Sequence, residues 1–403
     1  MASSILNPHA AGTVIVGISG GVDSAVAALL LLQAGYTVQG LFMSNWDEED
    51  SYCTAARDFQ DARRVCDTLG IPLHRVSFAA DYRERVFSIF LAEYAAGRTP
   101  NPDVLCNREI KFGVCLDYMH RLGADWIATG HYARVMHGIC GARGAPQARL
   151  LKARDPAKDQ SYFLHAVAPA ALARTLFPIG ELRKQEVRKI AHAAGLAVHD
   201  KPDSTGICFI GERPFSEFLS RYMAQAPGPI ETAEGRIVGE HVGLAFYTLG
   251  QRSGLHIGGR KGAADAPWYV AAKAEARNAL IVVQSQDHPL LLSDAFEVER
   301  VHWLLAPAPE LPAPLDCAVK TRYRQGDLAC RLEAGLGGGV RVALREPARA
   351  VTPGQYAVFY DGERCLGGGV IGRRFNVRAA GDGCAAPDTR KNAYNGAISV
   401  EGS

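Results

Sequence analysis

Two segments of the chain combine residues that could do chemistry with glycines that leave the backbone accessible. The first is "SGGVDS" at residues 19–24, which follows the apolar run "TVIVGI" at 13–18. The second is "DSTGICFIGER" at 203–213, which holds a single cysteine, Cys208. A glycine-rich turn from strand to helix favours anions, because free N–H groups point out of the helix N-terminus. Cys208 could be a buried bystander, a metal ligand or a nucleophile.

The 19–24 turn gives the stronger signal, and it predicts a phosphate site. The hydroxyls of Ser19 and Ser24 can add hydrogen-bond donors to the backbone N–H groups. The turn lacks the lysine of the G-x-x-x-x-G-K-[ST] loop and does not fit G-x-G-x-x-G. The alternative is a tight turn in which Asp23 only caps the helix. We expect the anion to be held by Gly17, Ile18, Ser19, Gly20, Gly21, Val22, Asp23 and Ser24.

The ten cysteines are scattered along the chain and form no close Cys-x-x-Cys pair of the kind that holds structural zinc. An iron–sulfur cluster usually needs three or four clustered thiolates. Cys106 precedes a helix predicted at 109–122, and the nearby Arg108 and Lys111 would favour its thiolate. Cys106 and Cys208, in two exposed-looking loops, would suit sulfur transfer, in which a thiolate attacks a sulfur–sulfur bond. Other thiols fit helix cores: Cys53, Cys66 and Cys115.

The first half of the chain alternates strands and helices as a parallel sheet requires. Strands are predicted at 13–18, 36–43, 72–78 and 125–131, and helices at 23–34, 54–69, 82–96 and 109–122. This α/β pattern predicts a doubly wound parallel sheet, whose ligands gather at the carboxyl ends of the strands. A further helix at 181–196 has a basic outer face over Arg183–Lys189, which could touch phosphates but which we expect to be solvated. Residues 137–151 suggest a hairpin or a surface loop, and no recognisable motif covers 137–149.

After about residue 212 short apolar runs alternate with glycine and proline, which favours β-structure. We therefore expect a catalytic domain over 1–212, a small β-rich central domain over 213–292 and a C-terminal β-barrel over 293–375. The tail at 376–403 is poor in large apolar residues and is expected to be disordered.

The bulk composition excludes little. With 48% hydrophobic and 21% charged residues the chain resembles an ordinary globular protein, and no apolar run is long enough to cross a membrane. The N-terminal segment lacks the features of a secretory signal, so we expect a cytoplasmic protein. The net charge of +2 is compatible with RNA binding, because basic residues can be confined to one face.

The sequence S-G-G-x-D-S after a strand resembles the pyrophosphate loop of the adenine-nucleotide α-hydrolase-like ATPases. These enzymes cut ATP between the α- and β-phosphates and place AMP on an oxygen of the substrate. Over about residues 12–372 the chain also resembles the tRNA-specific 2-thiouridylase family. The motifs that carry this likeness are "GLFMSNWDEE", "AGRTPNPDVLCNREIKF", "GADWIATGHYAR", "KDQSYFL", "KPDSTGICFIGER", "LGQRSGLHIGG", "VKTRYRQ" and "VTPGQYAVFY".

This resemblance implies an ATP-dependent enzyme that thiolates the wobble uridine of a subset of tRNAs. It would adenylate the C2 oxygen and then transfer sulfur from a cysteine persulfide, releasing AMP and pyrophosphate. Cys208 would carry the persulfide, Cys106 would be the nucleophile, and turnover would leave a transient Cys106–Cys208 disulfide. Mg²⁺ is expected with the ATP. A cysteine desulfurase or a relay protein would supply sulfur, and we expect a monomer.

The resemblance also assigns ligand contacts. Met43 and Gly130 would contact ATP, although Met43 could equally be a core residue. Asn101, Pro102 and Asp103 would meet the target base, with Asp103 exchanging a proton, although an aspartate there is often only a turn or cap residue. The other family positions that contact tRNA are His131, Lys158, Asp159, Gln160, Arg322, Tyr323 and Gln355.

Two other functions use the same features. A synthetase acting on a small metabolite could use the same phosphate loop and would be indifferent to loss of Cys208. A non-enzymatic RNA-binding or redox protein could carry a decayed loop, although the intact "SGGVDS" argues against this.

Overall fold

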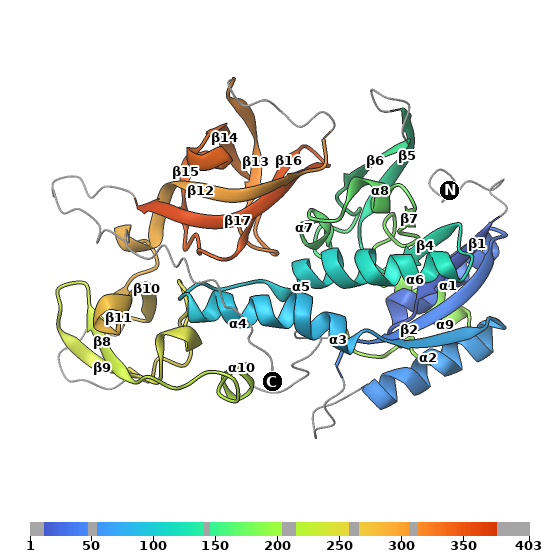
Figure 1. Cartoon of the computed structure of the whole chain (residues 1–403), viewed down its shortest axis with the longest axis horizontal. Helices are drawn as coiled ribbons and strands as arrows, with labels where there is room; N and C mark the ends of the chain where they lie inside the picture. The colour runs from blue at the N-terminus through green and yellow to red at the C-terminus, as the bar shows by residue number, and fades with distance from the viewer. Residues whose placement is uncertain are drawn as a thin grey trace, which may run out of the picture.

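A computed structural model describes residues 12–46, 55–140, 146–203, 215–257, 266–305 and 313–376. Figure 1 shows an α/β part on the right, a barrel at the upper left and a smaller β-rich unit at the lower left. No helix in these ranges is both long and apolar enough to cross a membrane. Cys208, Cys53 and the tail beyond Asn376 lie outside the described residues, so the expectations for them stay predictions.

The α/β part is built on a five-stranded parallel sheet in the order β3-β2-β1-β4-β7. Its strands are β1 (Thr13–Gly17), β2 (Thr37–Ser44), β3 (Leu73–Ser77), β4 (Trp126–Thr129) and β7 (Thr175–Leu176). β2, the next strand in the sequence, pairs with one edge of β1, and β4 pairs with the opposite edge of β1. This reversal of strand order opens a crevice at the carboxyl end of β1. The predicted doubly wound sheet is confirmed.

Helices cover both faces of this sheet. One face packs against α1 (Val22–Gln33), α2 (Ala55–Leu69) and α9 (Lys184–Ala193), through a core that includes Val14 and Val16. Ile15 points to the other face, where it joins side chains of the helices between residues 79 and 121. Because both faces are covered, all three of these central β1 side chains are fully buried.

The second face carries two long helical runs. The first joins α3 (Ala79–Tyr82), a π-helical stretch (Arg83–Phe87) and α4 (Ser88–Ala95). The second joins α5 (Pro102–Leu105), wide π-type turns (Cys106–Val114) and α6 (Cys115–Arg121). The prediction that this second helix begins at 109 is wrong. It begins at Pro102, because proline fits the first helical position and Asn101 caps it by accepting the Asp103 N–H at 3.2 Å.

The remaining α/β elements are short. β5 (Arg134–Cys140) and β6 (Pro146–Leu151) form a hairpin, the first of the two alternatives that the sequence left open. Two one-turn helices follow, α7 (Ser161–Leu164) and α8 (Pro169–Leu172).

The central unit contains α10 (Phe215–Leu219) and a four-stranded sheet in the order β10-β11-β8-β9. Its strands are β8 (Gly228–Thr232), β9 (Ile237–His241), β10 (Trp268–Ala274) and β11 (Ala279–Gln284). Short 3-10 turns occur here and in the barrel, at Leu244–Phe246, Glu275–Arg277, Pro289–Leu291 and Leu336–Gly338.

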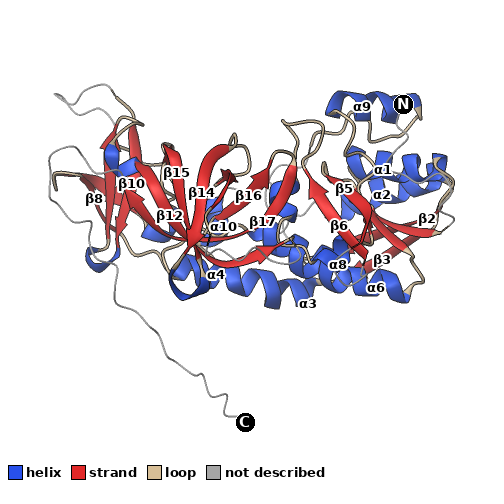
Figure 2. Ribbon diagram, turned by 90° about the horizontal axis from the view of Figure 1, so that it is seen from above, coloured by secondary structure: helices blue, strands red, loops and turns tan. Residues whose placement is uncertain are grey.

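The C-terminal part is a closed barrel, as predicted. Its strands run in the order β12-β15-β14-β13-β16-β17, and pairing of β12 with β17 closes the ring. They span β12 (Leu292–Trp303), β13 (Leu315–Lys320), β14 (Leu328–Ala334), β15 (Val340–Arg349), β16 (Tyr356–Asp361) and β17 (Arg364–Asn376). The β5–β6 hairpin of the α/β part pairs with β17 where Leu151 faces Arg364 (Figure 2).

Candidate functional site

The 19–24 turn forms a tight loop at the carboxyl end of β1. Gly20 has a φ of +77°, and a Cβ at this position would stand 2.3 Å from the carbonyl oxygen of Asp58, so only glycine fits. The Ser24 hydroxyl donates to the Gly21 carbonyl at 3.0 Å and accepts the Ser19 N–H at 3.2 Å. Gly21 is the N-cap of α1, so the alternative in which Asp23 caps the helix is wrong.

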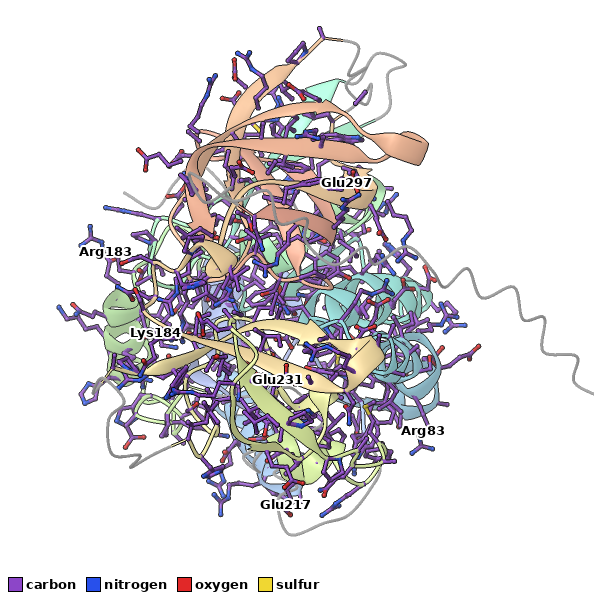
Figure 3. All side chains as sticks on the ribbon, turned by 90° about the vertical axis from the view of Figure 1, so that its left-hand side faces the viewer. Arg83, Arg183, Lys184, Glu217, Glu231 and Glu297 are labelled. Carbon is purple, nitrogen blue, oxygen red and sulfur yellow. The ribbon has the colours of Figure 1, made fainter. Side chains whose placement is uncertain are left out.

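Asp23, in the first turn of α1, is held by groups from two other elements. The hydroxyl of Tyr132 donates to its Oδ1 at 2.8 Å, and Nζ of Lys184 contacts both carboxylate oxygens at 2.8 Å. Figure 3 labels Lys184 and its neighbour Arg183 at the start of α9. Because its ammonium group is committed to carboxylates, Lys184 is not part of a solvated face.

Asp203, the first residue of the 203–213 stretch, binds three cations. Its carboxylate contacts Nζ of Lys158 at 2.5 Å, Nζ of Lys184 at 2.7 Å and Nη2 of Arg188 at 3.0 Å. Burial would raise the pKa of Asp203, but hydrogen bonds from Lys158 and Lys184 outweigh it and lower this pKa to about 2. The expectation of a solvated helix face is therefore wrong for Lys184 and Arg188, which tie α9 to Asp203.

Lys201 connects the same stretch directly to the phosphate loop. Its Nζ donates to the carbonyl of Gly20 at 3.0 Å and to Asp58 and Asp61 of α2 at 2.8 and 2.6 Å. Burial would lower the pKa of Lys201, but the hydrogen bonds to the two aspartates raise it. The segment that leads to Cys208 is thus fixed at Lys201 to the loop and α2, and at Asp203 to α9, whose Lys184 also binds Asp23.

Met43 and Gly130, the two residues outside the loop that the resemblance assigns to ATP, lie beside the loop. Met43 is half-buried near the end of β2, with its Cε 3.9 Å from where a Cβ of Gly17 would stand. Gly130 follows β4, and a Cβ there would lie 2.6 Å from the backbone nitrogen of Ser24. The fold therefore brings Gly17, Met43 and Gly130 together with the phosphate loop at one edge of the sheet.

Cys106 lies close to this edge, but not in the exposed loop that the sequence suggested. It is 1% exposed and lies inside the helical run, four residues after its first residue, Pro102. Nδ2 of Asn45 donates to its Sγ at 3.9 Å. Asn45 follows β2 directly, and its Oδ1 is buried with no hydrogen-bond partner among the described residues. Cys66 and Cys115 are buried in helices, as predicted.

Two titratable groups near Cys106 have pKa values shifted by burial. Burial raises the pKa of the half-buried Asp103, although nearby Lys111 opposes the shift. Burial, together with Lys111, lowers the pKa of His131 well below its usual range. Nδ1 of His131 lies 2.8 Å from the Thr129 hydroxyl. His131 is therefore a neutral hydrogen-bonding group rather than a cation for phosphate.

The Lys158-Asp159-Gln160 motif lies at the junction with the barrel. Asp159 is buried and accepts hydrogen bonds from the Ala153 and Ser161 N–H groups at 3.0 and 3.2 Å, while Nζ of Lys320 lies 3.4 Å away. Oε1 of Gln160 accepts the Tyr132 N–H at 2.9 Å. In this structure both side chains bind protein.

The same holds for the barrel residues assigned to tRNA. Nη2 of Arg322 donates to the carbonyls of Leu249 and Ala350, both at 2.9 Å, which ties the barrel to the central unit. The ring of Tyr323 packs against Phe163, with centroids 4.4 Å apart. These two side chains therefore link the three parts of the chain.

Gln355 binds the backbone that leads into the Asn101-Pro102-Asp103 segment. Its Nε2 donates to the carbonyls of Thr99 and Pro100 at 2.9 and 3.3 Å. The Thr99 N–H donates to the Pro353 carbonyl at 3.0 Å. The barrel thereby fixes the position from which the 102–121 helical run starts.

Sequence reasoning gave no role to several residues that the structure places at the site: Asn45, Asp58, Asp61, Tyr132, Lys184, Lys201 and Asp203. Only Asn45 carried a usable signal, because it lies two residues after the strand predicted at 36–43, at the ligand-binding edge. Within the described ranges no three His, Cys, Asp or Glu side chains gather as a metal ion would require.

Three family models match consecutive stretches of the chain. They are described as a tRNA methyl transferase HUP domain (12–212), a tRNA methyl transferase PRC-barrel domain (216–284) and an aminomethyltransferase beta-barrel domain (293–371). A solved 4-thiouridine synthetase–RNA complex with bound ATP aligns with 52% of this chain and 49% of its own, at 15% identity and a TM-score of 0.31, which is too distant to bear on the site.

Curated relatives match almost the whole chain. The tRNA-specific 2-thiouridylase of Chromohalobacter salexigens is 59% identical over 90% of this chain and 93% of its own. That of Methylococcus capsulatus is 55% identical over 94% of this chain and 100% of its own. Two of the family models carry methyl transferase names. The full-length relatives share more than half of their aligned residues with the chain, so they identify its family. The protein belongs to the tRNA-specific 2-thiouridylase family.

Proposed function

We propose that this tRNA-uridine 2-sulfurtransferase uses ATP to adenylate the C2 oxygen of a wobble uridine and then installs sulfur from a persulfide on Cys208. One observation carries the proposal. Cys106, a buried thiol, lies against Asn45 at the sheet edge that holds the phosphate loop. A nucleotide bound at the loop and a base presented to Cys106 would share that edge.

Adenylation solves a chemical problem, because the C2 carbonyl of uridine is a poor electrophile and its oxygen a poor leaving group. Residues 17–24, with Met43 and Gly130, would hold ATP so that its α-phosphate faces the base. N–H groups at the start of α1 would stabilise the pyrophosphate that departs. Asp23 is the carboxylate at the loop that would hold Mg²⁺, and the bound ion would neutralise charge on the phosphates.

Sulfur transfer follows in two displacements. The terminal sulfur of the Cys208 persulfide attacks C2, and AMP leaves with the former C2 oxygen. The Cys106 thiolate then attacks Sγ of Cys208, which breaks the sulfur–sulfur bond, leaves sulfur on C2 and forms the Cys106–Cys208 disulfide. Asp103, whose pKa is raised by burial, would exchange a proton with the base or its developing oxyanion.

For tRNA recognition we propose two groups of residues. Asn101, Pro102 and Asp103 would meet the target base, and His131, Lys158, Gln160 and Tyr323 would contact the neighbouring RNA. Asp159, Arg322 and Gln355, whose polar atoms bind protein here, would act mainly by holding the barrel against the catalytic domain. We also propose the boundaries 1–212, 213–292 and 293–375 for the three units, a monomeric enzyme, and a desulfurase or relay protein as sulfur donor.

The test is 2-thiouridine formation from tRNA, ATP and a persulfide donor. We expect Cys208→Ser and Cys106→Ser to form no 2-thiouridine, while both still produce AMP and pyrophosphate when tRNA is present. Cys115→Ser, which changes a buried thiol of α6, is the matched control and should keep the wild-type rate. Wild-type thiolation by Cys208→Ser would refute the sulfur route. ATP–pyrophosphate exchange without tRNA, unaffected by Cys208→Ser, would instead support a small-molecule synthetase.

A further inference from the structure

A small cavity lies behind the helical run that carries Asp103 and Cys106. Its volume is about 120 Å³, and its walls come from both the catalytic domain and the barrel. Asn101, Leu105 and Arg108 contribute one wall. The opposite wall is formed by barrel residues that include Arg300, Gly368 and Gly369, so the cavity exists only where the two parts meet.

This cavity is separate from the proposed reaction site. Asn101, Leu105 and Arg108 are spaced four and three residues apart, so they share one face of the helical run. Asp103 and Cys106 are out of step with this spacing. Their side chains therefore point to the other side of the helical run. A ligand could occupy the cavity without touching either group.

His165, one of the residues that line the cavity, carries a buried acceptor without a donor. His165 is fully buried, and its Nδ1 lies 2.7 Å from the Tyr162 carbonyl, which can only accept, so Nδ1 carries the proton. Burial lowers the pKa of His165 to about 4, which keeps the ring neutral. Nε2 is then an acceptor, and it has no hydrogen-bond partner among the described residues. Buried polar atoms are nearly always paired, so Nε2 points to a missing O–H or N–H group.

The same cavity has an excess of positive charge. Arg108 forms an ion pair with Glu109 through Nε at 2.6 Å, and Arg300 forms no ion pair within the described ranges. Arg300 also holds a φ of +47°, an uncommon value for a residue with a side chain. Glu93, the carboxylate of the cavity, is already neutralised by two hydrogen bonds from Arg98 at 2.5 and 2.6 Å. The lining therefore favours an anion.

An anion that also offers a hydroxyl donor matches both features, and a ribose phosphate is such a group. We propose that the cavity binds one ribose-phosphate unit of the tRNA backbone. Arg108 and Arg300 contact the phosphate, and Nε2 of His165 accepts a hydrogen bond from the 2′-hydroxyl, the group that distinguishes RNA from DNA. The inference rests on tRNA as the substrate. It gains support from Asn101, which lines the cavity and belongs to the segment proposed to meet the base.

The phosphate contacts are tested with the full-length protein and a labelled anticodon stem–loop RNA at several salt concentrations. We expect Arg108→Ala and Arg300→Ala each to weaken binding about three- to tenfold and to reduce the salt slope by about one. The matched control is Arg341→Ala, which removes an exposed barrel arginine packed over Phe375. Variants that bind like Arg341→Ala, with an unchanged salt slope, would overturn the proposal.

The 2′-hydroxyl contact is tested by comparing this RNA with a DNA of the same sequence. His165→Leu should lower the RNA-over-DNA preference about fivefold without weakening DNA binding, because one hydrogen bond is lost. His165→Gln, which keeps an acceptor, should restore part of the preference and guards against a folding defect in the leucine variant. An unchanged preference in both variants would contradict the assignment. Wild-type protein that does not bind the RNA would count against the proposed function instead.

Discussion

The phosphate loop and the junction between the catalytic domain and the barrel are built in opposite ways. The loop uses six consecutive residues, "SGGVDS", whose serines hydrogen-bond to one another and to the loop backbone. The junction uses side chains far apart in the sequence, such as Gln355 on the Thr99 carbonyl and Arg322 on the Leu249 carbonyl. A local sequence motif therefore forms the proposed ATP site, whereas contacts between distant segments form the proposed tRNA site.

This contrast changes how the two sides respond to substitution. At Gly20 of the loop, a single added carbon collides with backbone and should reduce ATP use by a large factor. At the junction, each side chain supplies one or two of several interdomain hydrogen bonds, so a single loss should weaken tRNA use by degrees. The four predictions that follow test this difference, starting with the largest effect.

Gly20→Ala should reduce ATP-dependent adenylation about a hundredfold, because a loop displaced by about 1 Å misplaces the reacting phosphate. The added Cβ would stand 2.3 Å from the Asp58 carbonyl oxygen, and the residue has a φ of +77°. AMP formation with saturating tRNA measures the effect. Gly21→Ala is the matched comparison, since its Cβ would approach nothing closer than the Ser19 hydroxyl at 3.5 Å. Equal losses in the two variants would argue against a strict steric limit at Gly20.

Asp203→Asn should destabilise the protein by about 1 kcal/mol at neutral pH, a figure reduced for the partial exposure of the carboxylate. The folded pKa of about 2 lies below the unfolded value, so this stability is present above about pH 4 and is lost as the pH falls toward 2. Denaturant unfolding of both proteins at a series of pH values measures the difference. Asp117→Asn, in α6, provides a control carboxylate. A difference that persists unchanged to low pH would rule out the ion-pair explanation.

The sequence predicted the parallel sheet, the barrel and the loop because each depends on local patterns. Strand and helix periodicity identified the elements, and the spacing of serines and glycines identified the loop. The start predicted at 109 for the 102–121 helical run is wrong, because Asn101-Pro102-Asp103 is as typical of a turn as of a helix N-terminus. That error placed Cys106 in an exposed segment, whereas it lies inside a buried helix.

The ion pairs around Asp203 could not be predicted from the sequence. Lys158, Lys184 and Arg188 come from different segments, and only the folded chain places them around one carboxylate. Lys184 and Arg188 were interpreted as a solvated helix face, since periodicity shows which face is polar but not what covers it. Long-range electrostatic contacts of this kind depend on packing that no local pattern records.

Gln355→Ala should raise the KM for tRNA about fivefold while leaving ATP affinity unchanged, because it removes the donor to the Thr99 and Pro100 carbonyls. Steady-state thiolation with varied tRNA and with varied ATP separates the two constants. Gln286→Ala, an exposed position that contacts Arg349, should change neither. A rise in the KM for ATP of the same size would show that the junction is not confined to the tRNA side.

His131→Gln should have the smallest effect at neutral pH, because the histidine is already neutral there. Its salt slope for tRNA binding should equal that of the wild type, since no charge is removed. The pH dependence is the sharper measurement. The folded pKa lies well below the usual value, so protonation favours the unfolded chain, and the stability contributed by His131 is complete above about pH 6.5. Below that pH, wild-type stability should fall faster than that of His131→Gln, by up to about 1.4 kcal/mol per pH unit. Parallel curves for the two proteins, or a salt slope that drops in the variant, would mean that His131 is charged and belongs with the phosphate-binding cations.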